Sequence, residues 1–132
     1  MLIRNSEKKK NMKIAVVLCT YNRLDGLKIA LQKYENKTVQ PDFIVIVNNA
    51  SSDGTRECLG VWKEKKAPFK KIIIHNEKNT GGSGGFSRGV EEALNLDCDY
   101  MFLADDDAYA EPQVLEELHK ADGRRSICFL VY

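Results

Sequence analysis

The chain has 132 residues, of which 43% are hydrophobic and 30% are charged, and its formal net charge is +1. This size and composition suit one globular domain with a core of its own. The near-neutral charge excludes the basic excess on which nucleic-acid binding depends, so no nucleic-acid partner is expected. No apolar run approaches the roughly 20 residues that a membrane-spanning helix needs.

The first segment, residues 1–12, is polar and basic and lacks the apolar stretch of a secretory signal. We interpret it as a flexible basic leader, which Lys8, Lys9 and Lys10 would attract weakly to anionic lipid. The four cysteines form no C-x-x-C pair and are interpreted as buried, reduced thiols. These features favour a cytoplasmic location, with peripheral association at the inner face of the plasma membrane as an additional expectation.

Short apolar runs then alternate with helical patterns. Residues 13–19 form a continuous, β-branched run typical of a strand buried on both faces. Apolar residues at helical spacing predict a helix from Leu24 that ends before Pro41. A second strand is predicted at 43–47, followed after a turn by a helix that ends near Lys66.

The second half of the chain continues the alternation. A third strand is predicted at 71–75, and residues 79–85 form a glycine-rich loop. The remaining elements are a helix over 86–96, a strand over 100–104, a helix over 111–120 and a strand over 126–132. This order predicts an α/β fold with a doubly wound, mostly parallel sheet and helices on both faces.

In such sheets, ligands bind beyond the carboxyl ends of the strands. Polar or glycine-rich segments follow each of the first four predicted strands, so we expect them to converge on one edge. The segments are Thr20-Tyr21-Asn22-Arg23, Asn48-Asn49, Asn79 to Gly85, and Asp105-Asp106-Asp107. This convergence indicates a ligand site independently of any family.

The three adjacent aspartates would raise one another's pKa unless a cation compensated their charges. Carboxylate oxygens suit Mg²⁺ or Mn²⁺, and alternation along an extended segment places Asp105 and Asp107 on the same face. Asp106 would then point elsewhere, toward a ribose or sugar hydroxyl. The alternative is an acidic turn or a helix N-cap, which needs only one aspartate.

The glycine-rich segment would let the backbone approach a ligand, and the following helix N-terminus favours anions. A flexible loop or tight turn is the alternative interpretation. Arg88 would add positive charge near a phosphate or would simply be solvated.

Other polar residues have two interpretations each. The amide of Asn49 offers a donor and an acceptor to a base such as uracil or thymine, or it belongs to a turn. Arg23 would reach a phosphate with its guanidinium or is a surface charge. His75 and His119 are interpreted as structural or surface residues.

The segments named above, together with the apolar strands that precede them, resemble family 2 glycosyltransferases of the GT-A fold. Gly81-Gly82-Ser83-Gly84-Gly85-Phe86-Ser87-Arg88 and the three aspartates resemble, within that family, bacterial galactofuranosyltransferases, and related rhamnosyltransferases share much of the pattern. The resemblance covers about residues 13 to 118. It implies that residues 13–132 are a nucleotide-sugar-binding domain, truncated at its C-terminal end.

The resemblance also implies an activity: metal-dependent transfer, with inversion, of galactofuranose or rhamnose from a UDP- or dTDP-sugar donor. The acceptor would be a glycan or lipid-linked glycan in cell-wall or surface polysaccharide synthesis. The implied metal ligands are Asp105 and Asp107, with Mn²⁺ or Mg²⁺. The implied donor-binding residues are Thr20, Tyr21, Asn22, Arg23, Asn49, Asn79, Gly81, Gly82, Asp105 and Asp106.

Two departures from the family pattern matter. Many members carry aspartates where this chain has Asn48 and Asn49, so base contact here would be made by a neutral amide. The catalytic base and the acceptor-binding part are expected beyond Tyr132. A non-catalytic nucleotide-sugar-binding fragment and a sugar nucleotidyltransferase remain alternatives, although the latter usually has a basic glycine-rich loop after its first strand.

Overall fold

The computed structural model describes residues 13–36, 40–106 and 128–129. The leader, the helix predicted at 111–120 and most of the last predicted strand lie outside these residues. None of the helices in the described part of the chain is long and apolar enough to cross a membrane.

The described part of the chain contains one sheet of five parallel strands in the order β3-β2-β1-β4-β5. Their bounds are β1 Ile14–Thr20, β2 Phe43–Asn48, β3 Lys70–His75, β4 Tyr100–Asp105 and β5 Cys128–Phe129. The order reverses at β1, because β2 and β3 extend the sheet on one side and β4 and β5 on the other. The predicted parallel, doubly wound sheet is therefore confirmed.

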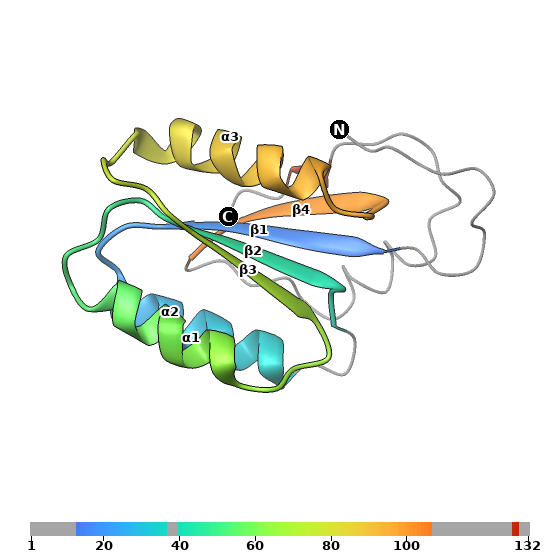
Figure 1. The fold of residues 1–132 in the computed structure, drawn as a ribbon, viewed down its shortest axis with the longest axis horizontal. Coiled ribbons are helices and arrows are strands. Elements are labelled where there is room, and N and C mark those ends of the chain that lie inside the picture. Colours follow the sequence, from blue (N-terminus) through green and yellow to red (C-terminus); the bar gives the residue numbers. More distant parts are fainter. Residues whose placement is uncertain (1–12, 37–39, 107–127, 130–132) are drawn as a thin grey trace.

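Among the described residues, three helices connect β1, β2, β3 and β4 and cover both faces of the sheet. Helices α1 (Leu24–Glu35) and α2 (Thr55–Glu64) lie together on one face, whereas α3 (Gly81–Leu94) lies on the other (Figure 1). Each helix runs back from the carboxyl end of one strand to the amino end of the next. All three helix N-termini are thus directed toward the carboxyl ends of the strands.

The core has two layers because successive side chains of a strand point to opposite faces. In β1, Val16 and Leu18 pack toward α1 and α2, while Ala15 and Val17 pack toward α3. All four side chains are fully buried. This two-sided burial explains why the strand appears in the sequence as a continuous apolar run.

Close packing of α3 against the sheet depends on its glycines. A β-carbon at Gly89 would lie 2.5 Å from Val17 Cγ1, and one at Gly85 would overlap Cys19 Sγ. Two glycines four residues apart therefore form the helix face that contacts β1. The glycine-rich segment has a packing role that its sequence alone did not reveal.

One predicted boundary was wrong. The segment from Gly81 to Gly85 was expected to be a loop, but helix α3 already begins at Gly81. Glycine is a poor helix former, so contact with the sheet and the hydrogen bonds of the preceding residues must stabilise this first turn. The loop proper is limited to residues 76–80.

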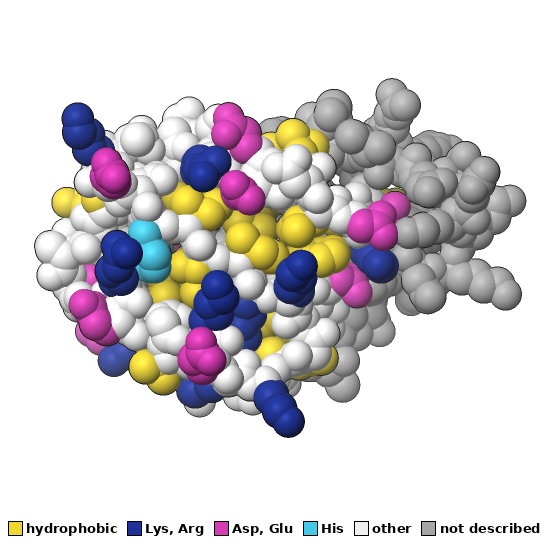
Figure 2. Space-filling view, in the orientation of Figure 1, with side chains coloured by type: hydrophobic (Ala, Val, Ile, Leu, Met, Phe, Trp, Pro, Cys, Tyr) yellow, Lys and Arg dark blue, Asp and Glu magenta, His cyan; other side chains and the backbone are white. Residues whose placement is uncertain are grey.

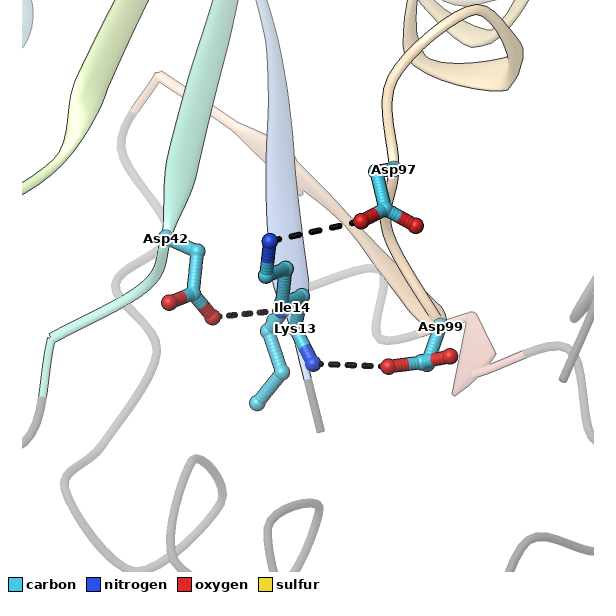
Figure 3. Close-up of polar contacts among 5 residues, drawn as sticks. All are labelled: Lys13, Ile14, Asp42, Asp97 and Asp99. Atoms are coloured by element: carbon cyan, nitrogen blue, oxygen red, sulfur yellow. Dashed lines mark hydrogen bonds and ion pairs between the residues drawn. The ribbon is translucent and has the colours of Figure 1, made fainter. Parts of the chain in front are cut away.

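Aspartates secure the amino end of β1 (Figure 3). Ile14 N donates to Asp42 Oδ2 at 2.8 Å, and Lys13 N donates to Asp99 Oδ2 at 2.9 Å. Lys13 Nζ also lies 3.3 Å from Asp97 Oδ2. Asp42 and Asp99 thus satisfy the first N–H groups of the central strand and tie it to the segments that lead into β2 and β4.

The described surface carries charges of both signs. Figure 2 shows basic and acidic side chains interspersed over the face viewed in Figure 1, with apolar side chains between α3 and the other two helices. The cysteines Cys19, Cys58 and Cys98 are free thiols, as predicted, but they are half-buried rather than buried. Burial raises the pKa of Cys98 to about 11.

Candidate functional site

A pocket of about 240 Å³ opens at the carboxyl ends of β1 and β2, beside the start of α3. Eight of its ten lining residues were predicted from the sequence to bind a donor. They are Thr20, Tyr21, Arg23, Asn49, Asn79, Gly81, Gly82 and Asp106. Cys19 and Phe86 also line it; both lie within the resembling segments, but as apolar residues they gave no separate signal.

Thr20, Arg23 and Asp106 form a linked group in the pocket wall. The Thr20 hydroxyl donates to Asp106 Oδ2 at 2.9 Å, and Arg23 Nε lies 3.5 Å from Asp106 Oδ1. Thr20 and Asp106 are almost fully buried, whereas about half of the Arg23 side chain is exposed. Asp106 therefore holds the guanidinium at the edge of the pocket while part of it remains accessible.

The amide of Asn49 lies at the junction of β2 and α3. Its Nδ2 donates to Asn79 Oδ1 at 3.0 Å and to the Gly81 carbonyl at 2.9 Å. Its oxygen accepts bonds from Thr80 and Asn76. The expected contact with a base stays a prediction, but both amide hydrogens are already used within the protein.

Asn22 does not line the pocket. It has a left-handed backbone with φ of 49°, and its Oδ1 accepts a bond from Ser52 N at 2.7 Å. Its own N–H donates to Ser51 Oγ at 3.0 Å. Asn22 thus joins the loop after β1 to the loop after β2, and both loops contribute residues that line the pocket.

Sequence reasoning had not singled out Asp53, which orders the same two loops. One carboxylate oxygen accepts from Leu24 N at 3.0 Å, and the other accepts from the Thr55 hydroxyl at 2.6 Å. Asp53 therefore contacts the first residues of both α1 and α2. The hydrogen bond from Thr55 is the main cause that lowers the pKa of Asp53. Asp53 lies two residues before α2, and an aspartate just before a predicted helix could have been recognised in the sequence as a residue that caps the helix.

Asn48 and His75 form a pair at the ends of β2 and β3. Asn48 Oδ1 accepts from Ser51 N at 3.1 Å, so Nδ2 faces His75 Nδ1, also at 3.1 Å. Because Nδ2 can only donate, Nδ1 must accept, which requires a neutral imidazole. Burial, followed by the nearby charge of Arg56, lowers the pKa of His75. The interpretation of His75 as a structural residue agrees with this pairing.

The first residues of α3 form one wall of the pocket. Gly81 has φ of 76°, and its N–H donates to Asn79 Oδ1 at 2.8 Å. Gly81 and Gly82 line the pocket, where the partial positive charge of a helix N-terminus favours an anion. A helix start, rather than a flexible loop, therefore forms this wall.

Arg88 does not line the pocket. Its guanidinium lies 3.4 Å from Glu92 and 3.8 Å from Glu91, on the surface of α3. Of the two interpretations of Arg88, the structure favours a surface residue of the helix.

Asp105 is the last residue of β4 and pairs in register with Cys19 of β1, so its backbone lies at the pocket end of the sheet. The side chain of Asp105 and all of Asp107 lie outside the described part of the chain. No group of three or more potential metal ligands occurs among the described side chains. Carboxylates at this position suit a hard divalent cation, and Asp106 is engaged by Thr20 and Arg23.

A larger hollow of about 590 Å³ lies between α1 and α2. It is lined mainly by helix residues and contains none of the predicted site residues. The chemistry-bearing side chains therefore gather at the smaller pocket.

Comparison with known proteins agrees with this arrangement. The family model described as glycosyl transferase family 2 matches residues 15–129. Galactofuranosyltransferase GlfT1 of Mycolicibacterium smegmatis is 30% identical over 106 residues, which are 80% of this chain and 33% of that protein. The chain thus spans about a third of the length of this relative.

Two further relatives have a similar extent of match. The uncharacterized glycosyltransferase YwdF of Bacillus subtilis is 34% identical over 83% of this chain and 38% of its own length. The cholesterol galactosyltransferase of Borreliella burgdorferi is 28% identical over 91% of this chain and 33% of its own length.

Proposed function

Because the chain belongs to glycosyl transferase family 2, we propose that it is the donor-binding part of an inverting glycosyltransferase. The observation that carries this proposal is the pocket itself. Arg23, held by Asp106, and the first residues of α3, Gly81 and Gly82, border the same space of about 240 Å³. A guanidinium and a helix N-terminus are both complementary to a diphosphate.

The proposed donor is a UDP- or dTDP-sugar, with galactofuranose or rhamnose as the sugar. Relatives named galactofuranosyltransferase support galactofuranose as the sugar. The acceptor would be a glycan or lipid-linked glycan in cell-wall or surface polysaccharide synthesis. The proposed location is cytoplasmic, with peripheral association at the inner face of the plasma membrane.

Asp105 and Asp107 would hold Mn²⁺ or Mg²⁺, which would neutralise charge on the departing diphosphate. Asp106 has a different role in this proposal, because it is bonded to Thr20 and faces Arg23. Its carboxylate orients the guanidinium toward the pocket and compensates its charge when no donor is bound. The proposed metal ligands are thus the aspartates on either side of Asp106.

The reaction would be a direct displacement. A base deprotonates an acceptor hydroxyl, whose oxygen then attacks the anomeric carbon from the face opposite the diphosphate. The bond from the anomeric carbon to the diphosphate oxygen breaks, and the electron pair leaves with the diphosphate. Arg23 and the N–H groups of α3 stabilise the charge that develops there.

Calorimetry with UDP and dTDP, with and without Mn²⁺, tests the donor site. We expect Mn²⁺ to strengthen diphosphate binding and Asp107→Ala to remove that gain. Asp97→Ala, which changes an exposed aspartate at the opposite end of the sheet, is the matched control and should behave as the unchanged chain. Binding that is absent under all conditions would contradict the proposal and favour a fragment that does not bind nucleotide sugars.

A further inference from the structure

We propose that Asp53 is a positioning residue for binding of the donor's diphosphate, because its carboxylate caps helix α1 from the neighbouring loop and so fixes Arg23 at the pocket. The inference rests on the proposed function in one respect, that Arg23 meets the diphosphate of a nucleotide donor. It adds to that function a residue that does not itself line the pocket. Asp53 would act only through Arg23.

The first argument is the kind of residue that begins α1. Arg23 is the N-cap of α1, with φ of −134° and ψ of 52°, and its side chain makes no capping hydrogen bond. An N-cap residue is usually serine, threonine, aspartate or asparagine, whose oxygen accepts from one of the first N–H groups of the helix. Arginine has no acceptor in its side chain. Another group must therefore supply the capping oxygen if this position is to present a guanidinium to the pocket.

Asp53 supplies this oxygen from the loop after β2. Its Oδ2 accepts from Leu24 N at 3.0 Å. Leu24 is the first residue of α1 and directly follows Arg23. The negative carboxylate also lies at the positive end of the helix dipole, where it stabilises the helix. Asp53 thus performs the capping role and leaves position 23 to an arginine.

The second argument is that contacts with one loop lie on both sides of Arg23. On its other side, Asn22 N donates to Ser51 Oγ at 3.0 Å, and Asn22 Oδ1 accepts from Ser52 N at 2.7 Å. The backbone is therefore tied to residues 51–53 immediately before and immediately after Arg23. This arrangement sets the position of the Arg23 backbone relative to the end of β2.

The other oxygen of the carboxylate anchors Asp53 itself. Oδ1 accepts from Thr55 Oγ1 at 2.6 Å and from Thr55 N at 3.3 Å, at the start of α2. The N-cap of α2 is Gly54, which has no side chain, so the same carboxylate serves this helix too. Asp53 therefore joins the beginnings of two helices that lie on the same face of the sheet (Figure 1).

The third argument is that the side chain of Arg23 needs this restraint. Arg23 lines the pocket together with Asp106, and Arg23 Nε lies 3.5 Å from Asp106 Oδ1. About half of the Arg23 side chain is exposed. A long, half-exposed side chain keeps many rotamers open, so the position of its backbone limits where the guanidinium can reach. Asp106 restrains the guanidinium, and Asp53 restrains the backbone that carries it.

The test compares UDP with uridine, which lacks the phosphates, by NMR titration. Asp53→Ala should weaken UDP binding by about three- to tenfold, the factor that corresponds to a lost N-cap bond, and should leave uridine affinity unchanged. Asp53→Asn is the conservative variant, because its amide oxygen can still accept from Leu24 N while its N–H donates to Thr55 Oγ1. It should bind UDP more tightly than Asp53→Ala. Equal losses for UDP and uridine would overturn the inference.

Gln40→Ala is the matched control, because it removes a cap from the other end of the same helix. Gln40 Nε2 donates to the carbonyls of Glu35 at 2.8 Å and Tyr34 at 3.2 Å. None of these three residues lines the pocket that contains Arg23. Both alanine variants should lower the free energy of unfolding, but Gln40→Ala should leave UDP affinity unchanged. If it weakened UDP binding as much as Asp53→Ala does, the cause would be helix stability and the inference would fail.

A double-mutant cycle tests whether Asp53 acts through Arg23. Arg23→Gln removes the guanidinium and should itself weaken UDP binding. In the Arg23→Gln chain, Asp53→Ala should weaken UDP binding no further, because the group that Asp53 positions is absent. Additive effects of the two substitutions would show that Asp53 acts by another route and would contradict the inference.

These measurements separate the inference from the proposed function. If the unchanged chain binds no UDP, the proposed donor site fails, and the inference that rests on it fails too. If the unchanged chain binds UDP and Asp53→Ala binds it equally well, the donor site stands and only the positioning inference fails. Amide exchange with water, measured by NMR without a ligand, should be faster at Leu24 in Asp53→Ala and unchanged there in Gln40→Ala. An unchanged rate at Leu24 in Asp53→Ala would contradict the capping role.

Discussion

Aspartates lie at both ends of the central strand β1, and their partners differ. At the amino end, Asp42 and Asp99 accept bonds from the backbone N–H groups of Ile14 and Lys13. In return, the N–H of each aspartate donates to the carbonyl of the same residue, Ile14 or Lys13. These reciprocal pairs join neighbouring strands, and each carboxylate accepts a hydrogen bond from a backbone N–H group.

At the carboxyl end, Asp106 bonds to the Thr20 hydroxyl and faces the Arg23 guanidinium. These partners are side chains, and all three residues line the pocket. The comparison teaches that an aspartate beside a buried strand is not in itself a sign of a ligand site. What distinguishes the two ends is the direction of the parallel strands, which leaves room for a ligand only where the connecting loops separate.

The largest expected effect is on UDP affinity, which should respond differently when an aspartate is replaced by alanine at one end of β1 or at the other. Asp106→Ala should weaken UDP binding by about 10- to 100-fold, because Arg23 loses the charged group that orients it. Asp99→Ala should leave UDP affinity unchanged and lower the free energy of unfolding by about 1–3 kcal/mol, because Lys13 N loses its acceptor. Calorimetry and chemical denaturation measure the two quantities.

Asp106→Asn is the control for the first substitution, since it keeps an oxygen acceptor for Thr20 but removes the charge facing Arg23. Its affinity should fall between those of the unchanged chain and Asp106→Ala. If Asp99→Ala weakened UDP binding as strongly as Asp106→Ala, the functional distinction between the two ends would be lost.

A smaller effect is expected for the glycines of α3. Gly85→Ala should reduce stability by about 1–2 kcal/mol and weaken UDP binding, because the added methyl group overlaps Cys19 Sγ in the pocket wall. Gly82→Ala is the matched variant, since a β-carbon there meets nothing within 4 Å. It should raise the melting temperature through better helix propensity. Equal melting temperatures for the two variants would contradict the close packing of α3 on β1.

The smallest effect concerns pH and His75. Burial is the main cause that lowers the pKa of His75 in the folded chain. The folded chain therefore favours the neutral imidazole. As pH falls below the ordinary value of 6.5, the unfolded chain takes up the proton first, and stability declines until the folded residue is protonated too. The bond from Asn48 would be lost, at a cost of no more than about 1 kcal/mol.

Denaturation curves between pH 7.5 and roughly pH 5, a range that brackets the ordinary histidine pKa, measure this effect. His75→Gln, which does not titrate, should have a flatter pH dependence than the unchanged chain. Parallel curves for the two chains would show that the Asn48–His75 pair contributes nothing.

Much of the fold could be predicted because its signals are local. The apolar run at 13–19 corresponds to β1 at Ile14–Thr20, and the predicted strand at 43–47 to β2 at Phe43–Asn48. Continuous apolar runs indicate strands buried on both faces, and their alternation with amphipathic helices indicates parallel pairing. The same topology predicted that polar segments distant in sequence would meet at one edge.

The start of α3 could not be predicted in this way. Five residues from Gly81 to Gly85, four of them glycine, look like a loop when only their own propensities are considered. The helix begins there because Asn79 bonds to Gly81 N and because Gly85 fits against Cys19, and both contacts depend on the folded sheet. Tertiary packing overrides intrinsic propensity at this point.

The sequence by itself predicted the fold class and the end of the sheet at which the pocket lies, and the family resemblance named eight of the ten residues that line it. Only the tertiary structure decided what each polar group does there. Thr20 and Asp106 are 86 residues apart, and Asn49 and Asn79 are 30 apart. Hydrogen-bond partners at such separations depend on the register of the strands and on how α3 packs against the sheet. No local sequence pattern predicts either of these. For that reason the sequence shows neither that Asp106 bonds to Thr20 and faces Arg23 nor that Asn49 bonds to Asn79 and Gly81.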